Sequence, residues 1–261
     1  MSDSTALRFA DQVALVTGGS RGIGLAIAKR LAGDGARVAL VARPSEALTK
    51  AAASIHGAVA VEADLAQPDP PAQAVAVALN AFGRLDMVVH SAGETRGGDF
   101  LALDDTVWEQ GFGAKFFGAV RLCRAAWPHL RVRGGRIVLI IGVGGRLARA
   151  DFAIGGSVNA ALMNLTKALA ARGIEDGVRV NAVSPGSVRT DRLAGRVAAR
   201  MRAEPSLTAE QADRALAREA GVTRAGEPHE IAAAVAFLCS TEASYIQGEI
   251  VTVDGGFTRA V

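Results

Sequence analysis

Short apolar runs alternate with longer amphipathic stretches along almost the whole chain. The runs are rich in β-branched residues, and this composition predicts strands at Val13–Thr17, Ala36–Val41, Ala58–Val61, Leu85–His90, Arg136–Ile141, Val178–Val183 and Glu249–Val253. Between them, Ala-rich stretches with helical periodicity predict helices near 21–33, 45–55, 69–82, 104–131, 152–173 and 228–240.

The predicted strands are apolar on both faces, which is typical of a parallel sheet covered by helices on both sides. With right-handed crossovers, this order of elements predicts an α/β fold, a single Rossmann-type doubly wound parallel sheet of about seven strands flanked by helices. We expect one dinucleotide-binding domain over residues 1–261. The segment 191–224 is polar, rich in Arg and without strand pattern, so we expect a substrate lid over the carboxyl ends of the strands.

Composition excludes several classes of protein. Half of the 261 residues are apolar and 21% are charged, which excludes a disordered chain, collagen and a coiled coil. A net charge of +3 without interleaved aromatic residues argues against nucleic-acid binding, and no apolar run is long enough to span a membrane, so we expect a cytoplasmic protein. No metal site is predicted, and Cys123 and Cys239 are expected to be buried.

A glycine-rich turn follows the first predicted strand directly. The sequence runs Thr17-Gly18-Gly19-Ser20-Arg21-Gly22-Ile23-Gly24 and continues into the first predicted helix. Glycines allow a tight turn and let backbone N–H groups approach a pyrophosphate at the positive end of that helix. The strand–turn–helix context favours a ligand site over an empty turn, and it predicts cofactor contacts by Gly18, Ser20, Arg21, Gly22, Ile23 and Gly24.

Arginines near this turn indicate which dinucleotide is bound. A carboxylate about 20 residues after the glycines would bind the ribose of NAD(H), whereas an Arg there would hold the 2′-phosphate of NADP(H). This chain has Arg43 at the end of the second predicted strand and Arg21 inside the turn. Two guanidinium groups suit a phosphate dianion, so we expect NADP(H) rather than NAD(H). The alternative is that both are solvated surface arginines.

Further motifs within residues 12–257 resemble the short-chain dehydrogenase/reductase family. They are TGGSRGIG, Asp64-Leu65, His90-Ser91-Ala92-Gly93, Arg179-Val180-Asn181, Ser184-Pro185-Gly186 with Thr190, and Asp254-Gly255-Gly256. The resemblance implies that Asp64 and Leu65 flank the adenine and that Ala92 and Gly93 line the cofactor ribose. It also implies contacts of the nicotinamide end with Pro185, Gly186, Val188 and Thr190.

The four catalytic positions of that family are all changed here. The family uses a Tyr that protonates the substrate oxygen, a Lys four residues later, a Ser thirteen residues before the Tyr, and an Asn on the preceding long helix. Ser157-Val158-Asn159-Ala160-Ala161-Leu162 lies where the family has Ser-x-Lys-Ala-Ala-Leu, and Trp108 sets the register of the preceding helix. The positions of Ser, Tyr, Lys and Asn then hold Gly142, Gly155, Asn159 and Lys115.

No neighbouring tyrosine can replace the missing one, because the single tyrosine, Tyr245, lies before the last predicted strand. Lys and Asn have exchanged places, and the family fold would keep the two side chains facing each other. We therefore interpret Lys115 and Asn159 as catalytic residues of a rewired site. The alternative is that Lys115 is an unrelated helix residue whose ammonium reaches solvent. His90 replaces the usual Asn of the family, and we expect it to satisfy backbone groups rather than to act catalytically.

The two glycines at the Ser and Tyr positions would open volume beside the nicotinamide. The run Gly142–Gly145 then offers backbone N–H groups that could stabilise an oxyanion, or it is simply a tolerated loop. Asp151 is a candidate proton donor, although a residue at this place is more often a helix cap.

Arg192, Arg196 and Arg200 recur every four residues in the predicted lid, so they share one face if that stretch is helical. Such a stripe would attract an anionic substrate, or it is a solvated face.

Three functions fit these observations. The first is an NADP(H)-dependent oxidoreductase that acts on an unknown small carbonyl or alcohol substrate. The second is a catalytically inactive cofactor-binding partner or regulatory subunit, and the third is a non-redox lyase or dehydratase. By analogy with the family we expect a homo-oligomer, a tetramer or dimer packed through the helices at 104–131 and 152–173.

Overall fold

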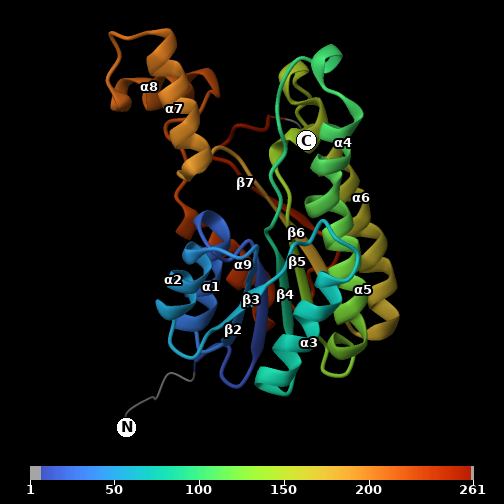
Figure 1. The fold of residues 1–261 in the computed structure, drawn as a ribbon. Coiled ribbons are helices and arrows are strands. Elements are labelled where there is room, and N and C mark those ends of the chain that lie inside the picture. The colour runs from blue at the N-terminus through green and yellow to red at the C-terminus, as the bar shows by residue number, and fades with distance from the viewer. Residues whose placement is uncertain (1–6, 260–261) are drawn as a thin grey trace.

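Seven strands form one parallel sheet, with helices on both of its faces (Figure 1). The computed structural model describes residues 7–259, so residues 1–6 and 260–261 of the predicted domain lie outside the described part. The strands, in the order β3-β2-β1-β4-β5-β6-β7 across the sheet, are β1 (Val13–Thr17), β2 (Arg37–Ala42), β3 (Val59–Glu62), β4 (Met87–His90), β5 (Arg136–Ile140), β6 (Arg179–Pro185) and β7 (Ile250–Val253). The predicted fold class is confirmed.

The nine α-helices of the described residues are α1 (Gly22–Gly33), α2 (Glu46–Ala53), α3 (Pro70–Phe82), α4 (Asp105–Phe112), α5 (Gly118–Leu130), α6 (Ala153–Asp176), α7 (Asp191–Ala203), α8 (Ala209–Glu219) and α9 (Pro228–Cys239). The helix predicted near 104–131 is present over Asp105–Leu130, but it contains a π-helical turn, Gly113–Phe117, between α4 and α5 that was not predicted. Between residues 7 and 259, none of the helices combines the length and apolar character needed to cross a bilayer.

Two hydrophobic cores lie on opposite faces of the sheet. In β1, Val13 and Leu15 belong to one core and Ala14 and Val16 to the other, because successive side chains of a strand point to opposite faces. Helices α3, α5 and α6 cover the first core, and α1, α2 and α9 cover the second. The two cysteines are buried as predicted, Cys123 in α5 and Cys239 in α9. Burial on both faces explains why the strand sequences are apolar throughout.

The switch in strand order places the carboxyl ends of β1 and β4 beside each other. The chain runs outward from β1 through β2 to β3 and then returns to β4 on the other side of β1. The turns after these two strands therefore diverge, since their helices go to opposite faces. A ligand of a doubly wound sheet binds in the crevice that this divergence leaves, so the fold puts the candidate site at this edge.

Helices α7 and α8 form a unit beyond the carboxyl end of β6, on the side of the molecule where the glycine-rich turn also lies (Figure 1). They occupy the segment 191–224 predicted as a lid, and that role stays a prediction. The two ends of this unit run side by side, since Val188 forms an isolated parallel bridge with Gly226. The N–H group of Arg189 donates to the Gly226 carbonyl at 2.8 Å.

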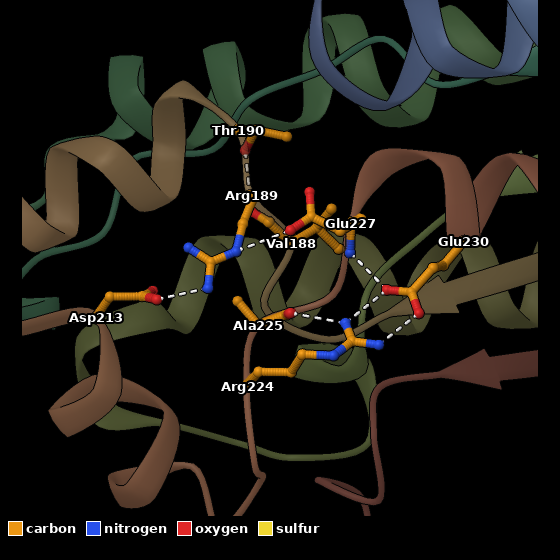
Figure 2. A network of polar contacts seen from close by, with 8 residues as sticks. All are labelled: Val188, Arg189, Thr190, Asp213, Arg224, Ala225, Glu227 and Glu230. Atoms are coloured by element: carbon orange, nitrogen blue, oxygen red, sulfur yellow. Dashed lines mark hydrogen bonds and ion pairs between the residues drawn. The ribbon is translucent and has the colours of Figure 1, made fainter. Parts of the chain in front are cut away.

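Ion pairs tie the same two ends together (Figure 2). The Arg189 guanidinium contacts Asp213 of α8 at 2.7 Å and Glu227 at 2.9 Å. Next to it, Arg224 donates to both carboxylate oxygens of Glu230, at 2.7 and 2.8 Å. The base of the α7–α8 unit is therefore fixed to the start of α9 by charge-assisted hydrogen bonds.

Arg179 at the start of β6 caps the end of α9. Its guanidinium donates to the carbonyl oxygens of Leu238, Ser240 and Ala243, each at 2.9 Å. The last carbonyls of a helix have no partner within the helix and carry a partial negative charge, so a half-buried guanidinium satisfies both their hydrogen bonding and their charge. This contact joins α9 to the middle of the sheet.

We predict that Arg179→Met lowers the free energy of unfolding by about 2–4 kcal/mol, because several carbonyls lose a charged donor at once. Urea unfolding of the two proteins measures the difference. The matched control is Arg214→Met, which breaks an exposed ion pair with Glu210 on α8 and should cost less than about 1 kcal/mol. Equal losses in the two variants would contradict the role of Arg179 as a helix cap.

Candidate active site

The glycine-rich turn between β1 and α1 has a backbone that only glycine adopts readily. Gly18 and Gly22 have φ angles of +66° and +55°. A Cβ atom on Gly18 would lie 2.9 Å from the Ser91 carbonyl oxygen, and one on Gly24 would collide with the Gly18 carbonyl. The turn therefore needs glycine for its conformation, for its own close approach to the loop after β4, and for the close approach of α1 to the turn.

The first turn of α1 fits an anion. Arg21 occupies the N-cap position without a side-chain hydrogen bond to the helix, and the first turn holds no acidic residue. Its N–H groups and the positive end of the helix are thus available for a phosphate oxygen, and no carboxylate side chain of that turn competes for them. These features fit the pyrophosphate of a dinucleotide.

Thr17 and His90 connect the glycine-rich turn to the loop after β4. The Thr17 hydroxyl oxygen accepts from the N–H groups of Ser91 and Ala92, each at 3.1 Å, and lies 3.1 Å from His90 Nδ1. His90 Nε2 lies 3.0 Å from the Lys115 carbonyl. Burial, together with the charge of Lys115, lowers the pKa of His90 to about 4, so the ring is neutral at pH 7 and Nε2 donates. The prediction that His90 satisfies backbone groups is confirmed.

Lys115 and Asn159 meet as the exchange of residues predicts. Lys115 Nζ donates to Asn159 Oδ1 at 2.7 Å and to the Ile141 carbonyl at 3.2 Å. Asn159 lies on α6 and is 3% exposed. Burial, with a smaller effect of Arg192, lowers the pKa of Lys115 to about 8. The alternative that its ammonium reaches solvent from an unrelated helix position does not hold.

The π-helical turn places this lysine. An extra residue in the turn widens the helix and lets Lys115 leave the regular helical register, and such turns are frequent at functional sites. Gly93, with a φ angle of +119°, packs its backbone against the Lys115 side chain, because any Cβ on Gly93 would collide there. Three glycines within eight residues, Gly111, Gly113 and Gly118, are the sequence signal that a uniform helix was doubtful.

The Phe152 ring takes the space beside Gly155, the changed Tyr position, and beside Gly144 in the loop after β5. A Cβ atom on Gly155 would collide with its ring, and one on Gly144 would lie 3.1 Å from it. The expectation that Gly155 leaves open volume is therefore wrong, because an aromatic ring three residues earlier fills that volume. Sequence reasoning missed Phe152, although a large aromatic residue just before a glycine-rich helix start was visible.

The run Gly142–Gly145 is partly committed to its own turn. The Gly145 N–H donates to the Gly142 carbonyl at 3.1 Å within a 3₁₀ turn, which removes this amide from those predicted to stabilise an oxyanion. A Cβ atom on Gly142 would lie 3.1 Å from Asn159 Nδ2. The missing side chain at 142 thus makes room for the Asn159 amide.

Asp151 is neither a helix cap nor a proton donor. Helix α6 has Phe152 as its N-cap and no side-chain cap. The Arg149 guanidinium holds the Asp151 carboxylate at 2.7 and 3.0 Å and keeps its pKa below the usual range, so it is ionised at pH 7. Among residues 7–259, no group of His, Cys, Asp and Glu side chains is arranged to bind a metal ion.

The other residues predicted from the resemblance converge on the same edge of the sheet. Leu65 is buried against Gly118, and Asp64 accepts from the Ala66 N–H at 3.1 Å. Thr190 lies beside Gly22, since a Cβ atom there would be 3.3 Å from the Thr190 methyl group. Ala92 and Gly93 lie in the loop after β4. Pro185 is the last residue of β6 and Gly186 follows it directly, and the Val188 side chain two residues later is buried.

The predicted cationic residues differ in their surroundings. Arg43 is exposed directly after β2, while Arg21 forms an exposed ion pair with Asp191 at 3.0 Å. In the stripe on α7, Arg200 is paired with Glu204 and Glu219, at 3.1 and 2.9 Å. The single tyrosine, Tyr245, is fully exposed before β7. It takes no part in the site.

Comparison with known proteins places the chain among oxidoreductases. A family model described as Enoyl-(Acyl carrier protein) reductase matches residues 18–258. Galactitol 2-dehydrogenase (L-tagatose-forming) of Cereibacter sphaeroides is 37% identical over 263 residues, which cover 99% of this chain and 99% of that protein.

Solved structures are similar over nearly the whole chain. L-Sorbose reductase from Gluconobacter frateurii, complexed with NADPH and L-sorbose, superposes with a TM-score of 0.93 at 31% identity and covers 98% of this chain and 100% of that one. A short chain oxidoreductase from Pseudomonas aeruginosa PAO1, described as containing an atypical catalytic center, has a TM-score of 0.91 at 29% identity and covers 97% and 99%.

We predict that Lys115 loses its proton between pH 7 and pH 9. With a pKa of about 8, roughly nine-tenths of its side chains are charged at pH 7 and about one-tenth at pH 9. The chain has only four lysines, Lys29, Lys50, Lys115 and Lys167, so NMR of ¹³C-lysine-labelled protein can follow each Cε resonance.

One resonance should shift with a midpoint near pH 8 and should be missing from Lys115→Met but present in Lys167→Met, the control on the exposed face of α6. A titration that persists in Lys115→Met would show that another group is responsible.

Proposed function

The chain belongs to the short-chain dehydrogenase/reductase family, and on that basis we propose that it is an NADP(H)-dependent oxidoreductase for a small carbonyl or alcohol substrate, with Lys115 and Asn159 at its catalytic centre. The observation that carries the proposal is the 2.7 Å hydrogen bond between these two side chains. It joins the two helical segments in which the family keeps its Asn and its Lys, in a chain whose glycine-rich turn is intact.

Residues at the carboxyl ends of five strands would hold the cofactor. The N–H groups at the start of α1 suit the pyrophosphate, and Arg21 and Arg43 suit a 2′-phosphate. Asp64 and Leu65 would flank the adenine, Ala92 and Gly93 the ribose, and the nicotinamide end would meet Pro185, Gly186, Val188 and Thr190. The NADPH complex of L-sorbose reductase supports NADP(H) as the dinucleotide. When bound, NADP(H) supplies or accepts a hydride at the substrate carbon.

Lys115 would donate a proton to the substrate oxygen. Two of the three ammonium hydrogens point to the acceptors Asn159 Oδ1 and Ile141 O, which leaves one N–H for a substrate oxygen. A pKa of about 8 lies close to neutral pH, where a general acid works best. Lys115 Nζ therefore donates the proton that a tyrosine gives elsewhere in the family. Asn159 orients Lys115, and the absence of a side chain at Gly142 leaves room for its amide.

We also infer that the chain forms a homo-oligomer through α5 and α6. An apolar groove between these helices is lined by Val120, Trp127, Leu165 and Leu169 among others. Family resemblance favours a second copy of the chain as its occupant. Sedimentation velocity measures the mass, and a monomer at micromolar concentration would contradict this inference.

Nucleotide binding is tested by thermal unfolding with NADPH and with NADH. Saturation at about 100 times the dissociation constant adds ~2.7 kcal/mol of stability. Arg43→Met should weaken NADPH binding about 10- to 100-fold through loss of a charge-assisted contact, and it should leave NADH binding unchanged. Arg133→Met, which replaces an exposed arginine at the opposite edge of the sheet, is the matched control. Absence of any nucleotide effect would refute the proposed cofactor.

Turnover is tested by NADPH consumption with a panel of small ketones and aldehydes. Lys115→Met should lower kcat about 100- to 10,000-fold, the range for loss of a general acid, while Lys167→Met should not change it. Binding without turnover in the wild type would favour the inactive partner, and full activity of Lys115→Met would exclude Lys115 as proton donor.

A further inference from the structure

We propose that the substrate carries an oxyanion group, a carboxylate or a phosphate, and that Arg192 and Arg196 of α7 bind this group beside Phe152. The proposal rests on the proposed function for the position of the reacting carbon, and it adds the chemical class of the substrate. It is carried by the placement of Arg192 and Arg196 beside the Lys115–Asn159 pair and by the fact that neither arginine has an ion-pair partner among residues 7–259.

Arg192 is held against the candidate site although it is an exposed residue. Its guanidinium carbon lies 5.0 Å from the centre of the Phe152 ring, over its face. The same ring contacts the positions of Gly144 and Gly155, and a Cβ atom on Gly144 would lie 3.5 Å from Asn159 Nδ2. Stacking on an aromatic face keeps the guanidinium plane fixed and its N–H groups free to bind a ligand.

Arg196 lies one helical turn further along α7 and faces the same way. Its Nη1 atom lies 3.4 Å from the Ser187 hydroxyl, in the segment that follows Gly186. Burial and the neighbouring charges of Arg149 and Arg192 lower the pKa of Arg196, and the more weakly coupled carboxylates of Glu219 and Asp151 act in the opposite direction. Arg192 also contributes to the lowered pKa of Lys115. Arg192 is therefore close enough to repel both Arg196 and Lys115.

No carboxylate of the described residues forms an ion pair with Arg192 or Arg196. By contrast, the third arginine of the stripe, Arg200, is paired with two glutamates. The acids on the adjoining segments are already engaged, Asp151 by Arg149 and Asp191 by Arg21. Of the three arginines in the stripe, Arg192 and Arg196 are thus the two that lack a carboxylate partner and can bind one from a ligand.

An oxyanion meets the requirements of this group. Guanidinium groups bind carboxylate and phosphate oxygens with paired, charge-assisted hydrogen bonds. An anion between Arg192 and Arg196 would remove their mutual repulsion and hold the substrate on the Phe152 side of the Lys115–Asn159 pair. Lys115 would then remain available for the oxygen of the reacting carbon, so one cation cluster serves two functions.

The test compares charged carbonyl compounds with neutral ones of the same shape. The carboxylate arm uses pyruvate and levulinate against their amides, and the phosphate arm uses dihydroxyacetone phosphate against dihydroxyacetone. In at least one arm, kcat/KM with NADPH should be about 10- to 100-fold higher for the anion, mainly through KM. Arg192→Met and Arg196→Met should each lower kcat/KM for the anion much more than kcat/KM for the neutral compound, so that most of the preference is lost.

Arg202→Met, at the end of the same helix, is the control variant and should keep the preference of the wild type. Thermal unfolding with each compound, with and without NADPH, measures anion binding without the need for turnover. If the protein shows no turnover but the anions still stabilise it, and this stabilisation is lost in Arg192→Met and Arg196→Met, the proposed function is refuted while the oxyanion site stands. Equal stabilisation and equal kcat/KM for anion and neutral compound in both arms would refute the oxyanion site, as would a preference that survives in both arginine variants.

Discussion

The site depends on holding one partly buried ammonium group without a carboxylate. Burial makes the charged form of a lysine costly, and here the oxygen atoms of Asn159 and Ile141 replace water as its acceptors. A carboxylate would hold the proton more tightly and keep the pKa of the lysine high, whereas neutral acceptors leave it at about 8. The π-helical turn and the glycine at 142 are the structural conditions for this arrangement, because they give the lysine its position and the amide its space.

The same lysine is linked to the nucleotide end of the site through neutral groups. His90 contacts the Lys115 carbonyl with one ring nitrogen and Thr17 with the other, and Thr17 accepts from the loop that leads to Gly93. A protonated histidine could not accept from Thr17, so burial of the ring protects this connection at neutral pH. The glycine-rich turn, the loop after β4 and the π-helical turn are thus positioned relative to one another by a continuous hydrogen-bonded path.

Much of this organisation could be predicted from the sequence, and the failures have identifiable causes. The strands were predictable since burial on both faces of a parallel sheet leaves long apolar runs, and the meeting of Lys115 and Asn159 followed from two registers that agreed. The π-helical turn was missed because its residues keep a helical pattern, and only the glycine content hinted at the change. Phe152 was missed because its ring fills the volume left by Gly155. Whether a ring three residues earlier does so depends on its side-chain rotamer, and no sequence motif predicts that rotamer. The ion pairing that distinguishes Arg200 from Arg192 and Arg196 depends on Glu204 and Glu219 at the ends of α7 and α8. The helical periodicity of the sequence does not predict that these glutamates lie beside Arg200.

The contacts that hold the two ends of the α7–α8 unit together make this unit separable from the rest of the fold. Val188 and Gly226 form a parallel bridge, and Arg189 forms ion pairs with Asp213 and Glu227. The two chain ends that connect the α7–α8 unit to the sheet are therefore held together as a fixed stem. Closing a longer loop on a fixed stem costs little additional entropy, since the cost grows only with the logarithm of loop length. The helices above the stem can therefore be lengthened, shortened or exchanged while β6, α9 and the nucleotide turn stay in place. The fold of this protein therefore allows the α7–α8 unit to be replaced as a module without any change in how its core folds.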